Sequence, residues 1–296
     1  MHWNPAPPAT QPMLTLNCRG RLLTLEVPRL LGVLNLTPDS FSDGGLYNTL
    51  DAALAQTERL LREGADIIDV GAASSRPGAP EVPEEEELRR IETIGPRLVE
   101  RFPEALFSVD TWRVRVASVL LDAGFHFVND ISAGRFEPEV LTLAAQAHAP
   151  VILMHMQGTP PTMQLNPHYT QPVDEVIQFL VERVQAAYAA GGRDVIVDPG
   201  FGFGKSLAHN LELLAGLDRL AALGLPVLVG ISRKRMVRAL AGGESPLEQA
   251  SVQGALHLEA LMRGARLLRV HEVAPAQRIV DLFLNLEDGA LRNRLS

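Results

Sequence analysis

The sequence predicts an α/β fold, a (β/α)8 TIM barrel, because eight short apolar runs alternate with longer stretches of helical character. The runs are almost wholly apolar rather than alternating, which is typical of parallel strands covered on both faces. Polar residues follow every run, whereas in a doubly wound open sheet they would gather near one switch point. The runs are residues 30–34, 67–71, 106–109, 125–128, 151–154, 195–197, 227–231 and the run that Arg269, Val270 and His271 close.

The length and composition fit one soluble barrel domain. A barrel of this kind has about 250 residues, and the chain has 296, of which 46% are hydrophobic and 21% charged. We therefore expect residues 13–296 to form a single domain and the Pro-rich residues 1–12 to form a disordered tail. No apolar run approaches the roughly 20 residues that cross a bilayer.

Charge and cysteine content narrow the functional class. A net charge of −8 argues against broad nucleic-acid binding, so an anionic substrate would need a local basic cluster or a metal ion. The single cysteine, Cys18, can form no internal disulfide, and the N-terminus lacks the segments of a signal peptide. We expect a cytoplasmic protein that binds neither nucleic acid nor membrane.

The segment before the first barrel strand is predicted to form a short N-terminal β-hairpin. Residues 13–27 alternate apolar and polar side chains around the turn sequence Cys18-Arg19-Gly20-Arg21. This hairpin should cover the end of the barrel that lies away from the chemistry.

Helices are predicted from apolar spacing and from start and stop residues. They cover residues 49–63, 84–101, 112–122, 137–148, 174–190, 207–223, 245–263 and 274–286. The clearest start is Ser245-Pro246-Leu247-Glu248, a capping box with Pro at the first helical position. The acidic residues 84–87 could form a binding patch, but a solvated helix start favoured by the helix dipole explains them better.

Four polar side chains that follow strands suit a planar nitrogen heterocycle. Asp110, Asn129 and Asp198 offer two carboxylates and an amide for amino and ring N–H donors, and Lys234 adds a donor. Any one of them could be a turn or capping residue. Their occurrence at the ends of several strands favours one shared site.

A second group suits phosphate oxygens and a hard cation. It consists of Arg76, Arg269 and His271, with Asn35 as an oxygen ligand. Because Val270 faces the opposite way along its strand, Arg269 and His271 should both point into the barrel beside Asn35. We interpret this pair as a clamp for an anionic leaving group.

Two tempting motifs are excluded. Residues 200–206, GFGFGKS, miss the phosphate-loop pattern because Pro199 stands where a glycine is required. The three alternating glycines indicate instead backbone that passes close to something flat, with Phe203 as a packing face. His155 and His168 lack the spacing and cysteine partners of a zinc site, so we expect core or loop histidines.

The long loops at residues 35–48 and 74–81 are expected to be mobile lids.

The strand-end segments, taken together, resemble those of the dihydropteroate synthases. In chain order they are GVLNLTPDSFSDGG, DIIDVGAASSRPGA, FSVDT, VNDISAG, LMHMQGTP, DPGFGFGK, GISRKRM and RVHEV. They cover nearly the whole barrel, and the ordered set is far more specific than any one segment.

The resemblance implies a reaction and its sites. 6-Hydroxymethyl-7,8-dihydropterin pyrophosphate would condense with 4-aminobenzoate, assisted by Mg²⁺, to give 7,8-dihydropteroate and pyrophosphate in folate biosynthesis. Catalytic roles are implied for Asn35, Arg76, Lys234, Arg269 and His271. Pterin-binding roles are implied for Asp110, Asn129, Asp198 and Lys234, and pyrophosphate-binding roles for Asn35, Arg269 and His271, with Asn35 as the metal ligand. Aminobenzoate-binding roles are implied for Ser75, Arg76, Pro77, Phe203 and Ser232. Sulfonamides would compete, and a homodimer is implied.

Two residues depart from the usual family pattern, and two other classes of pterin-binding barrel remain as alternatives. Ala73 stands where the family usually has Glu, and Ser75 where it usually has Thr, so a side-chain contact in that loop is in doubt. A methyltetrahydrofolate-binding methyltransferase barrel should not need the pyrophosphate clamp. A non-catalytic pterin-binding paralogue should have lost it, whereas Asn35, Arg269 and His271 are all present.

Overall fold

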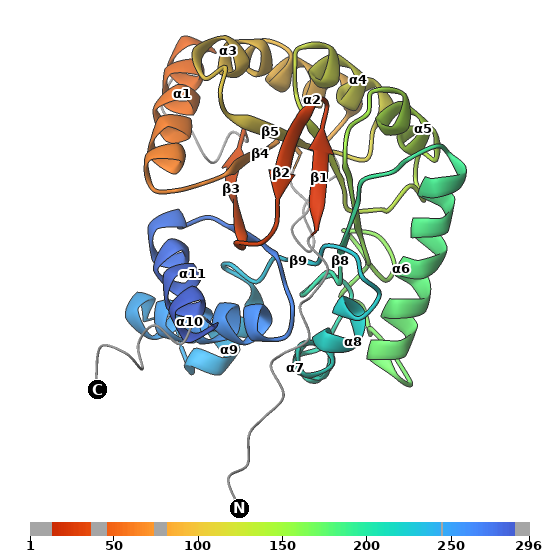
Figure 1. Cartoon of the computed structure of the whole chain (residues 1–296), viewed down its shortest axis with the longest axis vertical. Helices are drawn as coiled ribbons and strands as arrows, with labels where there is room; N and C mark the ends of the chain where they lie inside the picture. Colours follow the sequence, from red (N-terminus) through yellow and green to blue (C-terminus); the bar gives the residue numbers. More distant parts are fainter. Residues whose placement is uncertain (1–13, 37–45, 74–81, 244, 288–296) are drawn as a thin grey trace, which may run out of the picture.

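The fold is a closed parallel barrel surrounded by helices (Figure 1). The structure, a computed structural model, describes residues 14–36, 46–73, 82–243 and 245–287. The strand order is β8-β7-β6-β5-β4-β3-β10-β9, and a parallel bridge between Val197 and Val227 joins the two edges. The predicted (β/α)8 barrel is therefore confirmed, while the predicted tail at residues 1–12 lies outside the described residues.

The barrel strands follow the predicted runs closely. They are β3 (Arg29–Asn35), β4 (Ile67–Gly71), β5 (Leu106–Asp110), β6 (Phe127–Asp130), β7 (Val151–Met154), β8 (Val195–Asp198), β9 (Leu228–Val229) and β10 (Leu267–Val270). β6 begins two residues later than predicted. β9 has only two residues, because the chain turns soon afterwards, where the Lys234 N–H donates to the Ile231 carbonyl.

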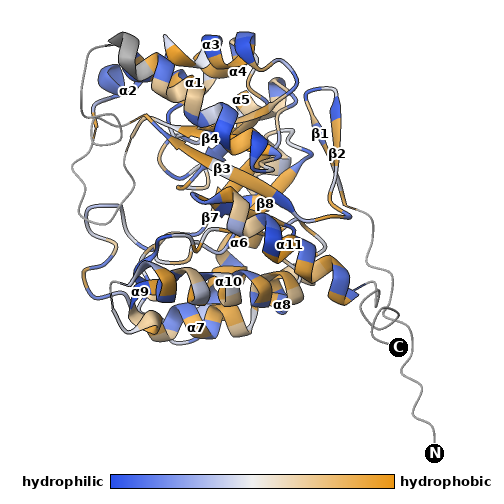
Figure 2. Ribbon diagram, turned by 90° about the vertical axis from the view of Figure 1, so that its left-hand side faces the viewer, coloured by the Kyte–Doolittle hydropathy of each residue, from blue (hydrophilic) through white to orange (hydrophobic). Residues whose placement is uncertain are grey.

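The predicted hairpin is confirmed as β1 (Thr15–Cys18) paired with β2 (Arg21–Thr24). Leu16, Cys18 and Leu23 pack against the first inward-facing residues of the barrel strands. Arg19 fixes the hairpin further by donating to the Phe125 carbonyl at 2.6 Å. The hairpin thus covers the end of the barrel where the strands begin, and Figure 2 shows it on that side of the molecule.

The helices differ from the prediction mainly where two predicted helices are each split in two. They are α1 (Leu46–Arg62), α2 (Glu84–Ile91), α3 (Ile94–Arg101), α4 (Val114–Asp122), α5 (Glu139–Gln146), α6 (Pro172–Ala189), α7 (Leu207–Ala215), α8 (Leu217–Ala221), α9 (Arg235–Ala241), α10 (Pro246–Met262) and α11 (Val273–Glu287). The predicted helix at 84–101 breaks because Pro96 has no N–H to donate to the Glu92 carbonyl and its ring crowds it. The one at 207–223 breaks at Gly216. No range was predicted for α9.

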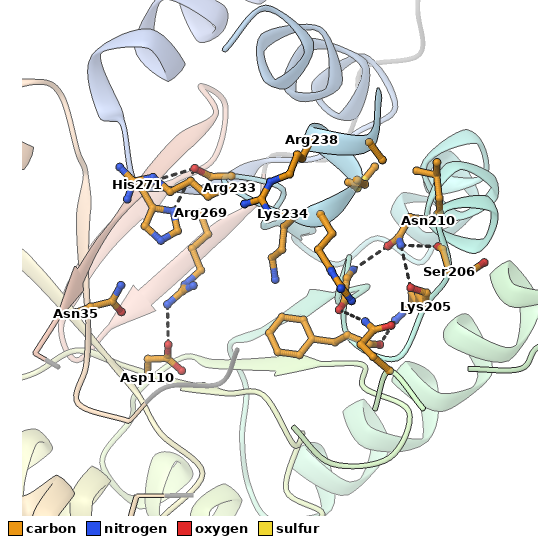
Figure 3. A pocket seen from close by; sticks show the side chains of 18 of the residues that line it. Asn35, Asp110, Lys205, Ser206, Asn210, Arg233, Lys234, Arg238, Arg269 and His271 are labelled. Atoms are coloured by element: carbon orange, nitrogen blue, oxygen red, sulfur yellow. Dashed lines mark hydrogen bonds and ion pairs between the residues drawn. The ribbon is translucent and has the colours of Figure 1, made fainter. Parts of the chain in front are cut away.

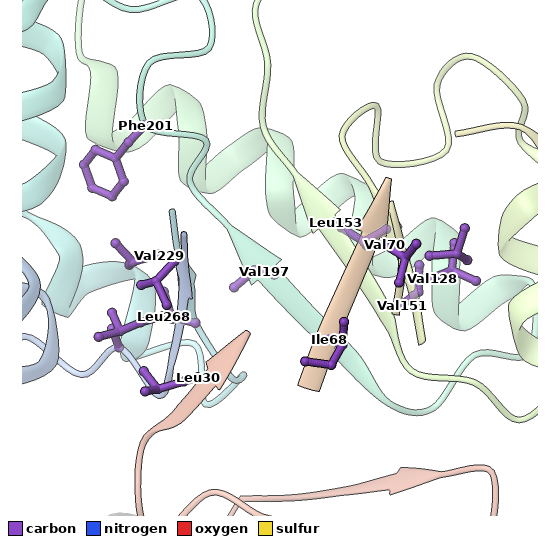
Figure 4. Close-up of a cluster of buried hydrophobic side chains, with 14 of the residues drawn as sticks. Leu30, Ile68, Val70, Val128, Val151, Leu153, Val197, Phe201, Val229 and Leu268 are labelled. Atoms are coloured by element: carbon purple, nitrogen blue, oxygen red, sulfur yellow. The ribbon is translucent and has the colours of Figure 1, made fainter. Parts of the chain in front are cut away.

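The main core lies between the sheet and the helices. Ile68 and Val70 of β4 belong to it, together with Val128 of β6 and Leu268 of β10 (Figure 4). Because side chains alternate along a strand, the residues between them face the barrel interior. That register places Asp69 inside the barrel.

The acidic start of α2 corrects one expectation. Glu84, Glu85 and Glu86 are at least partly exposed, as a solvated helix start requires. Glu87, however, is 1% exposed, and its carboxylate accepts from Thr111 Oγ1 at 2.7 Å and Arg113 Nη1 at 2.6 Å. Burial raises the pKa of Glu87. The solvated interpretation was wrong for this residue, which braces the segment after β5.

None of the described helices has the length and hydrophobicity needed to cross a membrane.

Candidate active site

The C-terminal ends of the strands surround one cavity of about 740 Å³ (Figure 3). A second, much smaller cavity of about 30 Å³ shares several of its lining residues. The described residues that line one or both cavities include nearly every predicted site residue: Asn35, Asp110, Asn129, Asp198, Phe203, Ser232, Lys234, Arg269 and His271. Ser75, Arg76 and Pro77 lie outside the described residues, as do most of the two predicted lid loops.

Arg269 joins two carboxylates inside the barrel. Its Nε lies 2.6 Å from Asp69 Oδ2, and its Nη2 lies 2.6 Å from Asp110 Oδ2. Burial raises the pKa of Asp110 to about 7, an effect that Arg269 opposes and Asp69 reinforces. Arg269, predicted to bind pyrophosphate, is therefore bonded to Asp110, predicted to bind the pterin, so the two predicted sets of residues are not separate.

Asp69 was missed by the sequence prediction. It is fully buried in β4, and its Oδ2 also accepts from Asn129 Nδ2 at 3.1 Å. A lone carboxylate inside an otherwise apolar strand was the available signal, because burying a charge is costly unless it is paired.

Asp198 and Lys234 also line the small cavity. Burial raises the pKa of Asp198 to about 6, although the Gly200 N–H donates to its Oδ1 at 2.7 Å. Burial lowers the pKa of Lys234 to about 7, against the attraction of Asp198. Lys234 Nζ lies 3.8 Å from the centroid of the Phe203 ring, a cation–π distance.

Ser232 and His271 meet through a network that also includes an unpredicted acid. His271 N–H donates to Ser232 Oγ at 3.3 Å, and His271 Nδ1 lies 3.2 Å from the same oxygen. Ser232 Oγ in turn donates to Glu272 Oε2 at 3.4 Å, while Glu272 Oε1 accepts from Arg233 Nε at 2.7 Å. Arg233 has a φ of 59°, a left-handed conformation that is strained for a non-glycine residue. The strained turn lies between two cavity-lining side chains, Ser232 and Lys234.

The glycine-rich loop after β8 passes close to other protein backbone. Gly200, Gly202 and Gly204 all have positive φ. A Cβ on Gly200 would lie 1.9 Å from the His155 carbonyl oxygen, so only glycine fits there.

A buried lysine holds this loop in place. Lys205 Nζ donates to the carbonyls of Gly200 at 3.0 Å and Phe203 at 3.1 Å, and it lies 2.8 Å from His155 Nδ1. Burial and, to a lesser degree, the charge of Lys205 lower the pKa of His155 to about 2, so the neutral ring can accept from the ammonium. His155 also packs edge to face on Phe179. The expected core histidine is confirmed, and Lys205 is a site residue that the sequence prediction missed.

The described residues contain no group of three or more His, Cys, Asp or Glu side chains that could hold a metal ion. Asn35, at the end of β3, instead offers one hard oxygen at the cavity, beside the β10 strand that carries Arg269. Mg²⁺ usually keeps several waters and binds through few protein oxygens plus substrate phosphates. The donor set therefore fits a magnesium ion that arrives with a phosphate-bearing substrate.

Comparisons with known proteins agree with this geometry. Residues 31–271 match the family of pterin binding enzymes. The dihydropteroate synthase of Haemophilus influenzae is 43% identical over 273 residues, which covers 91% of this chain and 98% of that protein.

Solved structures give the same result. The dihydropteroate synthase of Xanthomonas albilineans with 4-aminobenzoic acid is 46% identical and has a TM-score of 0.86 over 93% of this chain and 98% of that chain. The same enzyme with 7,8-dihydropteroate has 44% identity and a TM-score of 0.82, covering 93% and 99% of the two chains. The Yersinia pestis enzyme with a sulfonamide drug has 42% identity and a TM-score of 0.86, covering 93% and 100%. The chain belongs to the pterin-binding enzyme family and, within it, to the dihydropteroate synthases.

Proposed function

We propose that this cavity condenses 6-hydroxymethyl-7,8-dihydropterin pyrophosphate with 4-aminobenzoate to give 7,8-dihydropteroate and pyrophosphate. One observation carries the proposal. The acceptors Asp110, Asn129 and Asp198 and a basic edge, formed by Arg269 and His271, line two cavities that share several residues, and Arg269 bonds directly to Asp110 at 2.6 Å. The reaction needs this adjacency, because the pterin ring and its departing pyrophosphate are joined by one methylene group.

The acceptors suit the pterin. Asp110 and Asp198 would accept from amino and ring N–H groups, Asn129 would add its carbonyl oxygen, and Lys234 would donate to a ring nitrogen or carbonyl. The two carboxylates would also stabilise positive charge that develops on the electron-rich pterin as its C–O bond breaks. No enzyme nucleophile is required, and Cys18 lies at the other end of the barrel.

The basic edge suits the leaving group. As the methylene C–O bond lengthens, its electron pair moves onto the pyrophosphate, where Arg269 and His271 would compensate the growing charge. Asn35 would place its amide oxygen toward Mg²⁺ bound with the pyrophosphate. When bound, that ion would supply further neutralisation of the phosphate oxygens. The amine nitrogen of 4-aminobenzoate then forms the new bond to the methylene carbon and loses a proton.

The aminobenzoate would bind at the outer part of the cavity. Phe203 and Ser232 line both cavities, and hydrogen bonds from Lys205 to the Phe203 carbonyl and from Ser232 to Glu272 hold them in place. We assign Ser75, Arg76 and Pro77 to the same subsite, with Arg76 also in a catalytic role. Sulfonamides would compete there, since a related enzyme was solved with a sulfonamide drug.

The two alternative functions receive less support. A methyltetrahydrofolate-binding methyltransferase barrel has no pyrophosphate leaving group whose charge the basic edge would compensate. A non-catalytic pterin-binding paralogue would have no reason to keep Asn35, Lys234 and Arg269 at one cavity.

We also propose a homodimer in the cytoplasm. Supporting the dimer, α10 carries the exposed apolar residues Leu247 (78%) and Met262 (57%), and the neighbouring α11 carries Leu286 (49%). Sedimentation at increasing concentration tests this assignment.

The function is tested by supplying pterin pyrophosphate, 4-aminobenzoate and Mg²⁺ and measuring pyrophosphate release. We expect release that requires both organic substrates. Release without 4-aminobenzoate would indicate hydrolysis, and no release would refute the synthase assignment.

A further inference from the structure

Asp69 is a charged residue in the polar layer just beneath the proposed pterin site. It is fully buried, and its neighbours Ile68 and Val70 face the outer core, so its side chain lies inside the barrel. Its register partner on β5 is Ser108, which is also fully buried. Asp69 makes its contacts with more distant strands, β6 and β10.

One oxygen of Asp69 determines how Asn129 faces the cavity. A carboxylate only accepts hydrogen bonds, so the Asn129 Nδ2 group that lies 3.1 Å from Asp69 Oδ2 must be the donor. The Asn129 carbonyl oxygen is then the atom left for the substrate. With Asp110 and Asp198 it makes a set of acceptors that matches a heterocycle rich in N–H donors.

The same oxygen holds Arg269 from below. Arg269 Nε lies 2.6 Å from Asp69 Oδ2, while Nη2 reaches Asp110 at the same distance. Because a guanidinium is planar and is held here from two strands, its plane is fixed. Its Nη1 has no hydrogen-bond partner among the residues that the structure describes, so it can meet the pyrophosphate end of the substrate.

The other oxygen indicates that stability alone does not explain this residue. Asp69 Oδ1 is buried and has no hydrogen-bond partner among the described residues. Buried polar groups without partners are rare and costly, and an apolar residue of similar size would serve packing better. The contacts of Oδ2 with Asn129 and Arg269 explain why a carboxylate is present here despite the cost of burying Oδ1 without a partner.

We propose that Asp69 is a positioning residue of the synthase site, which sets the orientation of the Asn129 amide and of the Arg269 guanidinium. The proposal rests on the proposed function of the cavity. It assigns Asp69 no contact with the substrate; its effect passes through Asn129 and Arg269.

The test compares Asp69→Asn with the control Ser108→Ala, a neighbouring change in the same buried layer. Kinetics are measured by pyrophosphate release with each substrate varied in turn, and folding by thermal unfolding. For Asp69→Asn we expect kcat/KM for the pterin pyrophosphate to fall about 10- to 100-fold, as when a group that orients a binding side chain is removed. The KM for 4-aminobenzoate should stay within about twofold, because the hydrogen bonds of Asp69 in the described part of the chain go to Asn129 and Arg269 and not to Phe203 or Ser232. Ser108→Ala should resemble the wild type.

A double-mutant cycle separates positioning from packing. In an Asn129→Ala background, Asp69→Asn should cost clearly less than in the wild type, because one of the two groups it orients is gone. Equal costs in both backgrounds would contradict the Asn129 part of the proposal.

The outcomes distinguish the inference from the function on which it rests. An inactive wild type refutes the function. An active wild type with an unchanged Asp69→Asn variant, or with equal losses in Asp69→Asn and Ser108→Ala, overturns the inference alone. If Asp69→Asn does not fold, a crystal structure of the wild type with 7,8-dihydropteroate decides. The proposal requires Asn129 to bridge Asp69 and the pterin, and direct contact between Asp69 and the pterin would refute it.

Discussion

Lys205 Nζ lies 2.8 Å from His155 Nδ1 and also donates to two carbonyls of the loop that carries Phe203. An ammonium has three donors, and here each has an acceptor. The loop that lines the cavity is therefore anchored from beneath by a side chain that is 3% exposed.

Lys205→Met should weaken aminobenzoate binding. Met has a similar length and no donors, so the Gly200 and Phe203 carbonyls lose a partner, at about 1–3 kcal/mol for each unsatisfied group. We expect a lower melting temperature and a raised KM for 4-aminobenzoate, with a smaller change in the KM for the pterin pyrophosphate. Ser245→Ala is the control. It removes the N-cap of α10, should lower stability by about 1 kcal/mol, and should leave both KM values unchanged. Equal KM changes in the two variants would contradict the anchor.

Arg269→Lys should retain the fold better than Arg269→Ala while losing most turnover. Alanine leaves Asp69 and Asp110 buried without their cation, which costs about 3–5 kcal/mol. Lysine keeps the charge but cannot bridge two carboxylates with a planar fork. We expect pyrophosphate release by Arg269→Lys to fall about 10²-fold, the usual cost of one misplaced donor at a developing charge. Turnover near the wild-type rate would show that the fork is not needed.

The pH dependence of kcat/KM should be bell-shaped, with its optimum near neutral pH. The buried carboxyls of Asp198 and Asp110 have pKa values raised to about 6 and about 7, so their acceptor forms are lost as the pH falls. The pKa of Lys234 is lowered to about 7, so its charge is lost as the pH rises. These are groups of the free enzyme, whose titration kcat/KM reports.

Lys234→Arg is the matched variant for the alkaline limb. Arginine stays protonated in this range, so the alkaline limb should disappear even if the overall rate is lower. An unchanged alkaline limb would assign it to another group.

Lysine labelling offers an independent check, because Lys205 and Lys234 are the only lysines in the sequence. Burial lowers the pKa of each to about 7, which leaves both partly neutral and nucleophilic near pH 8. Both side chains line the cavity, but Lys234 is half-buried, whereas Lys205 is only 3% exposed and its ammonium is bonded beneath the loop. A limiting amount of acetic anhydride should therefore acetylate Lys234 first, as read by peptide mass spectrometry, and pterin pyrophosphate should protect it. Equally fast acetylation of Lys205 would contradict the buried anchor.

The sequence predicts the barrel, the hairpin and the strand-end residues well, because each depends on local periodicity and turn chemistry. Two helix breaks were missed although Pro96 and Gly216 marked them, since the apolar spacing runs on through both positions. α9 has only seven residues and too short a pattern to detect.

Contacts inside the barrel are the part that sequence reasoning could not supply. Asp69 and Arg269 are 200 residues apart and meet only because the barrel closes. The roles of Asp69, Lys205 and Glu272 depend on strand register and on how the loops fold back on the barrel, which a single sequence does not specify. For the same reason, the residues expected to bind the pterin and those expected to bind the pyrophosphate, predicted as two sets, form one hydrogen-bonded network.

The most direct test of the central claim follows the oxygen that joins the pterin methylene to the pyrophosphate. If that bridging oxygen is labelled with ¹⁸O, the account predicts pyrophosphate that carries the label and 7,8-dihydropteroate that forms in equal amount without it. The methylene C–O bond would then be the one that breaks at the basic edge of Arg269 and His271, beside Asn35. Label retained as hydroxymethyl-pterin, or unlabelled pyrophosphate, would show that a P–O bond breaks instead and would contradict the account.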